Sequence, residues 1–388
     1  MSEGIEARKS QDLLLAILRS ALNDTELDGS VKTQLSSDQL KSVCYLAKKH
    51  DIAHIVSAVL YKNGVQTDSE LQARLQKEEL LSIYRYEQME YAFSQICESL
   101  EELGVAYLPL KGAVIRPYYP YASMRTSCDI DILIHESDLD AVVGRLEQSN
   151  FRVGERDYHD VSLYCDNNIH LELHFNVQEN IEELDAVLKN AWEYAVPINE
   201  FRYGFSDAFF AFHQFAHMSY HFVSGGCGIR SLMDLWVMNK KMGIAPKQSE
   251  SLLKQADIYK FALEMSKLSE KCFSGGEMDD FCYAVLDYIF RGGVYGSSEN
   301  EIAVKKVKTD NTFLYAMKRL FPPFKVMAVL YPVLKKAPFL MPFCWIARWF
   351  KTLFGGKTKK VMSELSKANN LTAERAEEIR GIYSRLGL

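Results

Sequence analysis

The sequence contains no closely spaced cysteine pair and no uncharged apolar run long enough to cross a lipid bilayer. Its eight cysteines are scattered and none stands in a Cys-x-x-Cys spacing, which argues against a disulfide framework and against a zinc site built from cysteines. The longest uncharged apolar run near the C-terminus, residues 337–347, is too short for a span and holds two prolines. The first residues lack the basic start and long apolar core of a secretory signal. We therefore expect a reduced, cytoplasmic protein with no transmembrane segment.

Acidic residues are missing from one part of the chain. Between Lys318 and Lys360 there are ten Lys or Arg and no Asp or Glu, so the remainder of a chain with net charge −6 carries about −16. Aromatic residues are interleaved with these cations, and five prolines between Pro322 and Pro342 argue against one long amphipathic helix. Three interpretations of segment 318–360 stay open: a packed helical lid with a basic outer face, contact with an anionic membrane surface, and contact with RNA. The second would place the protein peripherally at the inner membrane surface.

The 388 residues, 48% of them hydrophobic, are enough for one large or two ordinary domains. Apolar residues recur at three- and four-residue spacing through residues 1–104, which predicts helices, the longest of them ending at Gly104. Residues 105–178 indicate strands, residues 179–291 indicate helices again, and residues 292–388 indicate a linker followed by a basic, aromatic helical region. We expect an α+β fold, in which a small mixed β-sheet core is embedded between mainly helical N- and C-terminal regions.

Five segments of the core have the length and pattern of β-strands: VAYLPL, CDIDILIH, FRVGE, DVSLYCDNN and IHLELHFNV. The pair Asn167-Asn168 predicts a tight turn between the last two. Between the second and third segments, ESDLDAVVGRLEQSN has the spacing of an amphipathic helix with Ser137 as its N-terminal cap.

Carboxylates interrupt two of these apolar strands. Residues two apart in a strand project from the same face, so Asp129 and Asp131 point together. In IHLELHF, the side chains of His170, Glu172 and His174 likewise share one face. If these two strands pair, Glu172 lies beside both aspartates.

Three carboxylates on one sheet face repel one another unless a cation neutralises them. An oxygen-rich set of this kind suits Mg²⁺ or Mn²⁺, which share phosphate oxygens with a substrate and serve in-line phosphoryl or nucleotidyl transfer. The structural alternative is that these acids line a sheet edge or pair with Arg125 and Lys111.

The stretches YLPLKGAVIRPYYPYASMRTSCDIDILI, IHLELHFNV and FFAFHQFAHMSYHFVSGGCGIRSLMDLWVM are similar to the bacterial nucleotidyltransferase-like family of the DNA polymerase β-type nucleotidyltransferase superfamily. The resemblance extends over roughly residues 107–348. It implies a minimal nucleotidyltransferase core with helical additions, a nucleoside triphosphate as donor, and metal-dependent transfer of a nucleoside monophosphate to a hydroxyl-bearing acceptor. The acceptor could be a small molecule, a polymer or a protein.

Carried onto this sequence, the resemblance makes Asp129 and Asp131 the metal-binding pair and Glu172 the third acid, all three catalytic. Lys111 and Gly112 stand where the superfamily commonly has Gly-Ser. There the Lys111 ammonium can face the triphosphate, and the Gly112 backbone can approach a phosphate oxygen.

Further nucleotide-binding candidates surround these acids. His170 and His174 flank Glu172 on its strand. Arg125, four residues before the aspartate pair, either reaches the same phosphates or holds an aspartate in place. Both roles stay open.

A helical stripe formed by His213, His217 and His221 is poor geometry for tetrahedral zinc, and we expect His217 to face the substrate. Arg230 either pairs with Asp234, one turn away, or binds substrate at the start of its helix, and the resemblance favours the second role. Two other functions stay open for the chain: a metal-dependent glycosyltransferase that uses a nucleotide sugar, and a non-catalytic nucleotide-binding protein of the same fold.

Overall fold

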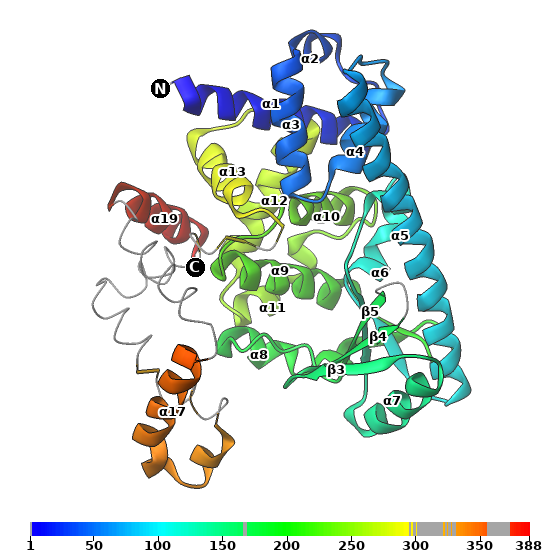
Figure 1. Cartoon of the computed structure of the whole chain (residues 1–388), viewed down its shortest axis with the longest axis vertical. Coiled ribbons are helices and arrows are strands. Elements are labelled where there is room, and N and C mark those ends of the chain that lie inside the picture. Colours follow the sequence, from blue (N-terminus) through cyan, green and yellow to red (C-terminus); the bar gives the residue numbers. More distant parts are fainter. Residues whose placement is uncertain are drawn as a thin grey trace. The chain divides into compact units, whose positions relative to one another are not determined.

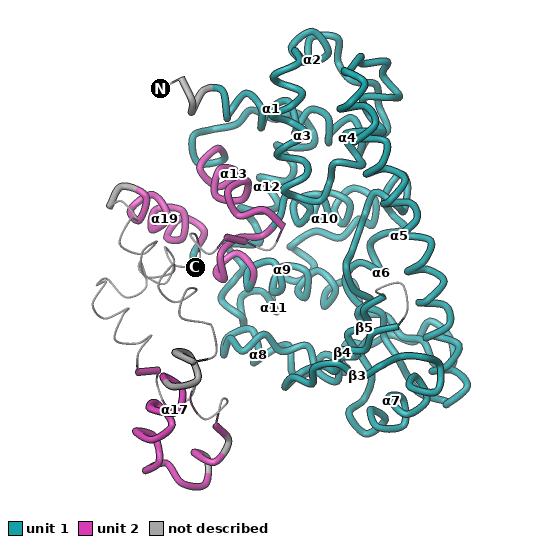
Figure 2. Tube along the Cα trace, in the orientation of Figure 1, with its two compact units in different colours: residues 1–220, 228–282, 387 teal, residues 221–227, 283–386, 388 magenta. Residues whose placement is uncertain are grey.

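The computed structural model describes residues 2–165, 169–294, 296–297, 300, 321–322, 324, 327, 331–354 and 373–388. The chain divides into two compact units: residues 1–220, 228–282 and 387 form the first, and residues 221–227, 283–386 and 388 form the second (Figure 2). The boundaries predicted at residues 104 and 178 both fall inside the first unit.

None of the helices in the described ranges combines the length and the apolar character that a bilayer crossing requires. The turn predicted at Asn167-Asn168 lies outside the described residues.

The N-terminal part of the first unit is helical, as predicted (Figure 1). Its helices are α1 Ser2–Asn23, α2 Gly29–Gln34, α3 Ser37–Lys49, α4 Ala53–Lys62 and α5 Ser69–Glu102. The long helix α5 begins where the Asp68 carboxylate accepts a hydrogen bond from the backbone N–H of Leu71, at 2.8 Å. It ends before Gly104, which has a φ of +68° and so takes the left-handed conformation that terminates many helices.

The sheet has five strands in the order β1-β2-β5-β4-β3. These strands are β1 Tyr107–Pro109, β2 Ile130–Ile134, β3 Arg152–Arg156, β4 Asp160–Cys165 and β5 Ile169–His174. Strands β2 and β5 run parallel and the other neighbours run antiparallel, so the sheet is mixed and the predicted α+β class is confirmed. Helix α7, Leu139–Gln148, was expected to be capped by Ser137. That residue lies instead in the 3-10 helix η3, Glu136–Asp138, and the residue before α7 is Asp138.

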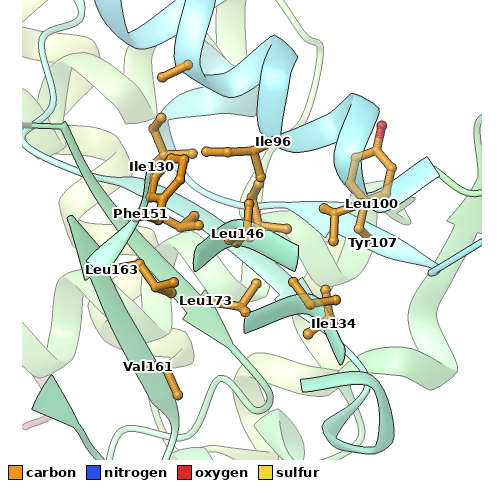
Figure 3. Close-up of a cluster of buried hydrophobic side chains, with 14 of the residues drawn as sticks. Ile96, Leu100, Tyr107, Ile130, Ile134, Leu146, Phe151, Val161, Leu163 and Leu173 are labelled. Carbon is orange, nitrogen blue, oxygen red and sulfur yellow. The ribbon is translucent and has the colours of Figure 1, made fainter. Parts of the chain in front are cut away.

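One face of the sheet packs against helices α5 and α7 (Figure 3). Ile130 and Ile134 of β2 and Leu173 of β5 join Ile96 of α5 and Leu146 of α7 in this core, and each of them is buried. Burying one such side chain contributes roughly 1.5–3 kcal/mol, so this face anchors the two central strands firmly. Because side chains alternate along a strand, the residues between them point to the opposite face.

The chain after the sheet was expected to be mainly helical, and most of its described residues are. The helices are α8 Glu182–Leu188, α9 Asp207–Val223, α10 Ile229–Lys240, α11 Glu250–Gln255, α12 Tyr259–Ser274, α13 Asp280–Gly292, α17 Met341–Phe354 and α19 Ala373–Leu386. The expectation is wrong for a short hairpin, β6 Ala195–Pro197 paired with β7 Tyr203–Phe205. Its three-residue strands are too short to show a periodic pattern.

Candidate active site

The parallel pairing of β2 with β5 places Asp131 directly opposite Glu172. This register brings the third acid beside the aspartate pair, as the sequence pattern predicted. Asp129 directly precedes β2, and Lys111 follows the short strand β1. The backbone N–H of Leu110 donates to the carbonyl of Asp131 at 3.0 Å, so β1 and β2 together hold Lys111 next to the acids.

Asp131 is the most enclosed acid of the cluster, with only 5% of its side chain exposed. Its Oδ1 accepts a hydrogen bond from Lys111 Nζ at 2.9 Å and contacts His174 Nε2 at 3.0 Å. Burial alone would raise the pKa of Asp131, but the charges and hydrogen bonds of Lys111 and His174 outweigh burial and hold this pKa well below its usual range. Asp131 is therefore ionised at neutral pH.

His174 responds to the same contacts in the opposite sense. Burial would lower its pKa, whereas the hydrogen bonds to Asp131 and Glu172 raise it to about 9. Its Nε2 lies 3.5 Å from Glu172 Oε2. Without a metal ion, a protonated His174 and Lys111 thus supply the positive charge that the acids need.

Asp129 has no comparable hydrogen bond or ion pair to a cation within the described part of the chain. Burial raises its pKa, the negative charges of Asp131 and Glu172 raise it further, and Lys111 compensates only in part, so that the pKa reaches about 6. A carboxyl group that resists ionisation beside two other acids marks a place where an added cation is stabilised.

The residues present fit a divalent cation. Two overlapping groups place one ligand atom from each member within 4.8 Å of the others: Asp129 with His170 and Glu172, and Asp131 with Glu172 and His174. Glu172 belongs to both groups. Two carboxylates and one imidazole form a donor set that suits Mn²⁺ and similar ions, and carboxylates with water suit Mg²⁺. The two histidines, predicted to bind nucleotide, thus also lie within reach of a metal ion.

Arg125 is bound by an acid from another part of the chain. Its guanidinium forms a bidentate ion pair with Asp234 of α10, in which Nε lies 2.9 Å from Oδ1 and Nη2 lies 3.0 Å from Oδ2. The hydroxyl of Tyr119 donates to the same Oδ1 at 2.6 Å. Of the two roles considered for Arg125, the structure contains the ion pair, although with an aspartate 109 residues away.

Arg230 binds Thr126, the residue that follows Arg125 in the chain. Its Nη1 donates to the carbonyl and to the hydroxyl of Thr126, at 2.9 and 3.1 Å, and lies 3.7 Å from Asp51 Oδ2. Of the two roles considered for Arg230, the local pair with Asp234 is not formed among the described residues: Asp234 pairs with Arg125, and Arg230 lies near Asp51. Gly112, the first residue of the short helix α6 Gly112–Ile115, is buried, and a Cβ there would lie 3.5 Å from Arg125 Nη1.

The predicted histidine stripe divides along α9. Burial lowers the pKa of His213 to about 3, so its ring is neutral. His217 Nδ1 lies 2.9 Å from Glu179 Oε1, and burial, followed by the positive charge of Lys111, lowers the pKa of His217 well below its usual value. His221 belongs to the second unit. Sequence reasoning missed Glu179, because nothing in its local sequence links it to a histidine 38 residues later.

Strand β4 adds two polar residues to the face of the sheet that carries the acids. Sequence reasoning did not single out these two residues. Ser162 lies opposite Glu172, and its hydroxyl contacts His170 Nε2 at 3.1 Å. Tyr164 lies opposite His170, and the two rings stack with centroids 4.5 Å apart and planes inclined by 6°. The alternation in DVSLYC was the available signal, since Ser162 and Tyr164 share the face away from the core.

A mixed sheet with an Asp-x-Asp pair at the start of one strand and a third acid opposite it on the parallel neighbour is the arrangement that the sequence resemblance implied for a nucleotidyltransferase core. The chain belongs to a family of uncharacterised nucleotidyltransferases, whose model matches residues 36–274. No curated protein matches the chain.

The solved structures to which the chain is similar include an antibiotic-resistance factor and a CCA-adding enzyme. The antibiotic-resistance factor ANT(2'')-Ia is 13% identical, over 50% of this chain and 93% of that one, with a TM-score of 0.26. The Thermotoga maritima CCA-adding enzyme, complexed with tRNA, is 11% identical, over 79% of this chain and 85% of that one, with a TM-score of 0.21.

Proposed function

We propose that the protein is a metal-dependent nucleotidyltransferase that moves a nucleoside monophosphate from a nucleoside triphosphate to a hydroxyl-bearing acceptor. The observation that carries the proposal is the register of β2 and β5, which sets Asp131 opposite Glu172 with Asp129 beside them. In this reaction the acceptor oxygen forms a bond to the α-phosphorus, the bond from that phosphorus to the bridging oxygen breaks, and pyrophosphate leaves.

Asp129, Asp131 and Glu172 would hold Mg²⁺ or Mn²⁺. When bound in pairs, such ions neutralise the phosphate oxygens, activate the attacking hydroxyl and stabilise the leaving group. The protein's own contribution is to keep three carboxylates at one place despite their repulsion, which it does by fixing them on two neighbouring strands whose other faces are buried in the core.

Other residues prepare the site for this role. Lys111 and His174 keep Asp131 ionised, and Lys111 carries a positive charge that can turn from the aspartate to a phosphate. Glu172 would accept the proton of the acceptor hydroxyl. Neutral His217, oriented by Glu179, would bind substrate polar groups without adding charge.

The first test is calorimetry of the binding of ATP, GTP, CTP and UTP, with and without Mg²⁺ or Mn²⁺, to the wild type and to Asp129→Ala/Asp131→Ala. We expect metal-dependent binding of at least one triphosphate, and its loss in the double variant. Asp140→Ala is the matched control, because the Asp140 side chain is 95% exposed on α7. The product assay then uses the bound triphosphate with panels of small-molecule, polymer and protein acceptors and follows release of pyrophosphate.

Three outcomes would contradict the proposal. If no triphosphate binds in a metal-dependent way, a nucleoside triphosphate is not the donor substrate. Binding of a nucleotide sugar in its place makes the protein a glycosyltransferase. Tight triphosphate binding without turnover over all acceptor panels makes it a non-catalytic nucleotide-binding protein.

We also propose a cytoplasmic location. None of the eight cysteines, all of them among the described residues, forms a disulfide, and four of them, Cys227, Cys272, Cys282 and Cys344, are buried. Cysteines that stay out of disulfides throughout a chain are typical of a reducing compartment. Fractionation of cells that express the tagged chain would test this location.

A further inference from the structure

The second unit contains a helix that exposes an apolar stripe. Along 338–347, every residue classed as exposed is apolar: Pro338, Phe339, Pro342, Phe343, Ile346 and Ala347. The exposed fraction reaches 77% for Phe339 and 67% for Phe343, and it is 45% for Ile346. Large apolar side chains rarely remain this open in neighbouring positions without an interaction partner.

These side chains lie on one side of the helix. Phe339, Phe343 and Ile346 are spaced by four and three residues, which is one stripe of an α-helix. Phe339 lies in the 3-10 helix η8, Pro338–Leu340, that leads directly into α17. The prolines at 338 and 342 fall at or near helix starts, where the missing N–H is tolerated, so they do not interrupt the stripe.

The opposite side of the helix is already occupied by the segment's own small core. Cys344 is buried with Leu334 and Met327, and Trp345 packs against the same cluster. Trp345 Nε1 donates to the carbonyl of Pro322 at 3.0 Å, and Phe321 meets the Trp345 ring edge-on. The residues of the apolar stripe are thus different from those that form the small core of this segment.

The charge of segment 318–360 indicates which kind of surface the stripe binds. In the sequence, residues 318–360 hold ten cations and no acid, so the stripe belongs to a positively charged segment of a chain whose remainder is negative. Lys336, one of these cations, is exposed close to the stripe. A surface that combines aromatic and aliphatic side chains with cations matches the interface of an anionic lipid bilayer, where both groups are stabilised at once.

The composition of the stripe distinguishes lipid from RNA. Single-stranded nucleic acid is bound by aromatic rings on which bases stack, interleaved with cations on the same face. Here the stripe carries no charged residue, and Pro338, Pro342 and Ile346 offer no aromatic ring for stacking. A hydrocarbon boundary accepts all of these side chains equally.

We propose that Phe339, Phe343 and Ile346 insert into the headgroup boundary of a membrane that contains anionic lipids, and that the cations of segment 318–360 bind the lipid headgroups. The contact is peripheral, because α17 has 14 residues and holds Arg348 and Lys351. It would bring the protein to a lipid surface without a spanning segment and independently of the nucleotidyltransferase site.

The test is co-sedimentation of the full-length protein with vesicles of phosphatidylcholine, with and without phosphatidylglycerol. We expect binding only when phosphatidylglycerol is present, weakened by added salt. Phe339→Ser/Phe343→Ser should reduce the bound fraction at least tenfold, because it removes the inserted side chains but not the charge. Phe343→Trp should retain binding, and its emission should shift to the blue with vesicles relative to the wild type, which corrects for the four native tryptophans.

Matched controls separate this effect from misfolding and from general stickiness. Tyr61→Ser removes a side chain that is 78% exposed on α4 and should leave vesicle binding unchanged. Circular dichroism and thermal unfolding should be the same for the Phe339/Phe343 variant and the wild type. Failure to bind anionic vesicles, or binding that does not depend on the two phenylalanines, overturns the proposal. Binding of RNA without binding of vesicles overturns it in favour of a nucleic-acid surface.

Discussion

The ammonium group of Lys111 lies 2.9 Å from the Asp131 carboxylate, in a position where only 20% of the Lys111 side chain and 5% of the Asp131 side chain are exposed. A buried ion pair of this kind is a weak source of stability, but removing one member leaves a charge without compensation. Lys111 also reaches this position by a turn in which its φ is +43°, a value that few non-glycine residues adopt. The chain thus accepts backbone strain to place a cation beside this acid.

Replacing Lys111 with methionine should destabilise the protein. The variant retains much of the side-chain volume but leaves Asp131, among the described residues, with His174 as its remaining charged partner. We expect a loss of about 3 kcal/mol in the free energy of unfolding at neutral pH. The loss should shrink in acid, where Asp131 takes up a proton. Urea unfolding at several pH values measures it. Lys62→Met, which breaks an exposed pair with Asp24, is the control and should change little; equal losses in both variants would contradict the buried pair.

Replacing Asp129 with asparagine should stabilise the metal-free protein. The pKa of Asp129 is raised from about 4 in the unfolded chain to about 6 in the folded one, so its contribution to stability is full below pH 4 and is lost as the pH rises through 6. At pH 8 the variant should be more stable by about 2 kcal/mol, and metal-dependent triphosphate binding should be absent. Thermal unfolding from pH 4 to 8 in the presence of a chelator checks this. Identical pH profiles for wild type and variant would show that Asp129 is not under strain.

Replacing Arg125 with lysine distinguishes the two roles considered for this residue. A lysine cannot reproduce the bidentate pair with Asp234, so stability should fall by about 3 kcal/mol. The triphosphate affinity of the folded protein should stay close to that of the wild type, since the guanidinium is engaged by Asp234. Calorimetry well below the unfolding temperature measures this affinity. Unchanged stability with a large loss of affinity would make Arg125 a phosphate ligand.

Replacing Gly154 with alanine should disturb the stacked pair of Tyr164 and His170. The added Cβ would lie 2.5 Å from Tyr164 Cε2 and 3.3 Å from the Ser162 carbonyl oxygen, so the tyrosine ring must move. We expect a destabilisation of about 1–3 kcal/mol, reduced when Tyr164→Ala is added. Gly144→Ala on α7 is the matched control, because its Cβ meets nothing within 4 Å, and it should stabilise by up to about 1 kcal/mol. No relief in the double variant would place the strain elsewhere.

Local pattern was sufficient for the strands that carry the acids. Alternation with a period of two assigned Ile130 and Leu173 to the core face and Asp131 and Glu172 to the other, and the buried cluster confirms this division. The same alternation constrains how the neighbouring strands pair, because a one-residue shift of register would turn every one of these side chains to the wrong face.

Pairs that join distant parts of the chain could not be predicted in the same way. Arg125 and Asp234 are 109 residues apart, and Glu179 and His217 are 38 apart. Each residue alone is an ordinary charged or polar side chain in its local sequence. Only the packing of α9 and α10 in the first unit decides which partner it meets, and no periodicity in the sequence encodes that choice.

The alternation along β2 has a consequence for how such a chain would drift under mutation. The core face of the strand stabilises the protein, whereas burial and the neighbouring acids oppose ionisation of Asp129 on the other face. Asp131 differs, because Lys111 and His174 compensate its charge. A descendant with no use for the site is therefore expected to lose Asp129 first and to keep its core. We expect Asp129 to be retained only where the function of the site outweighs the loss of stability.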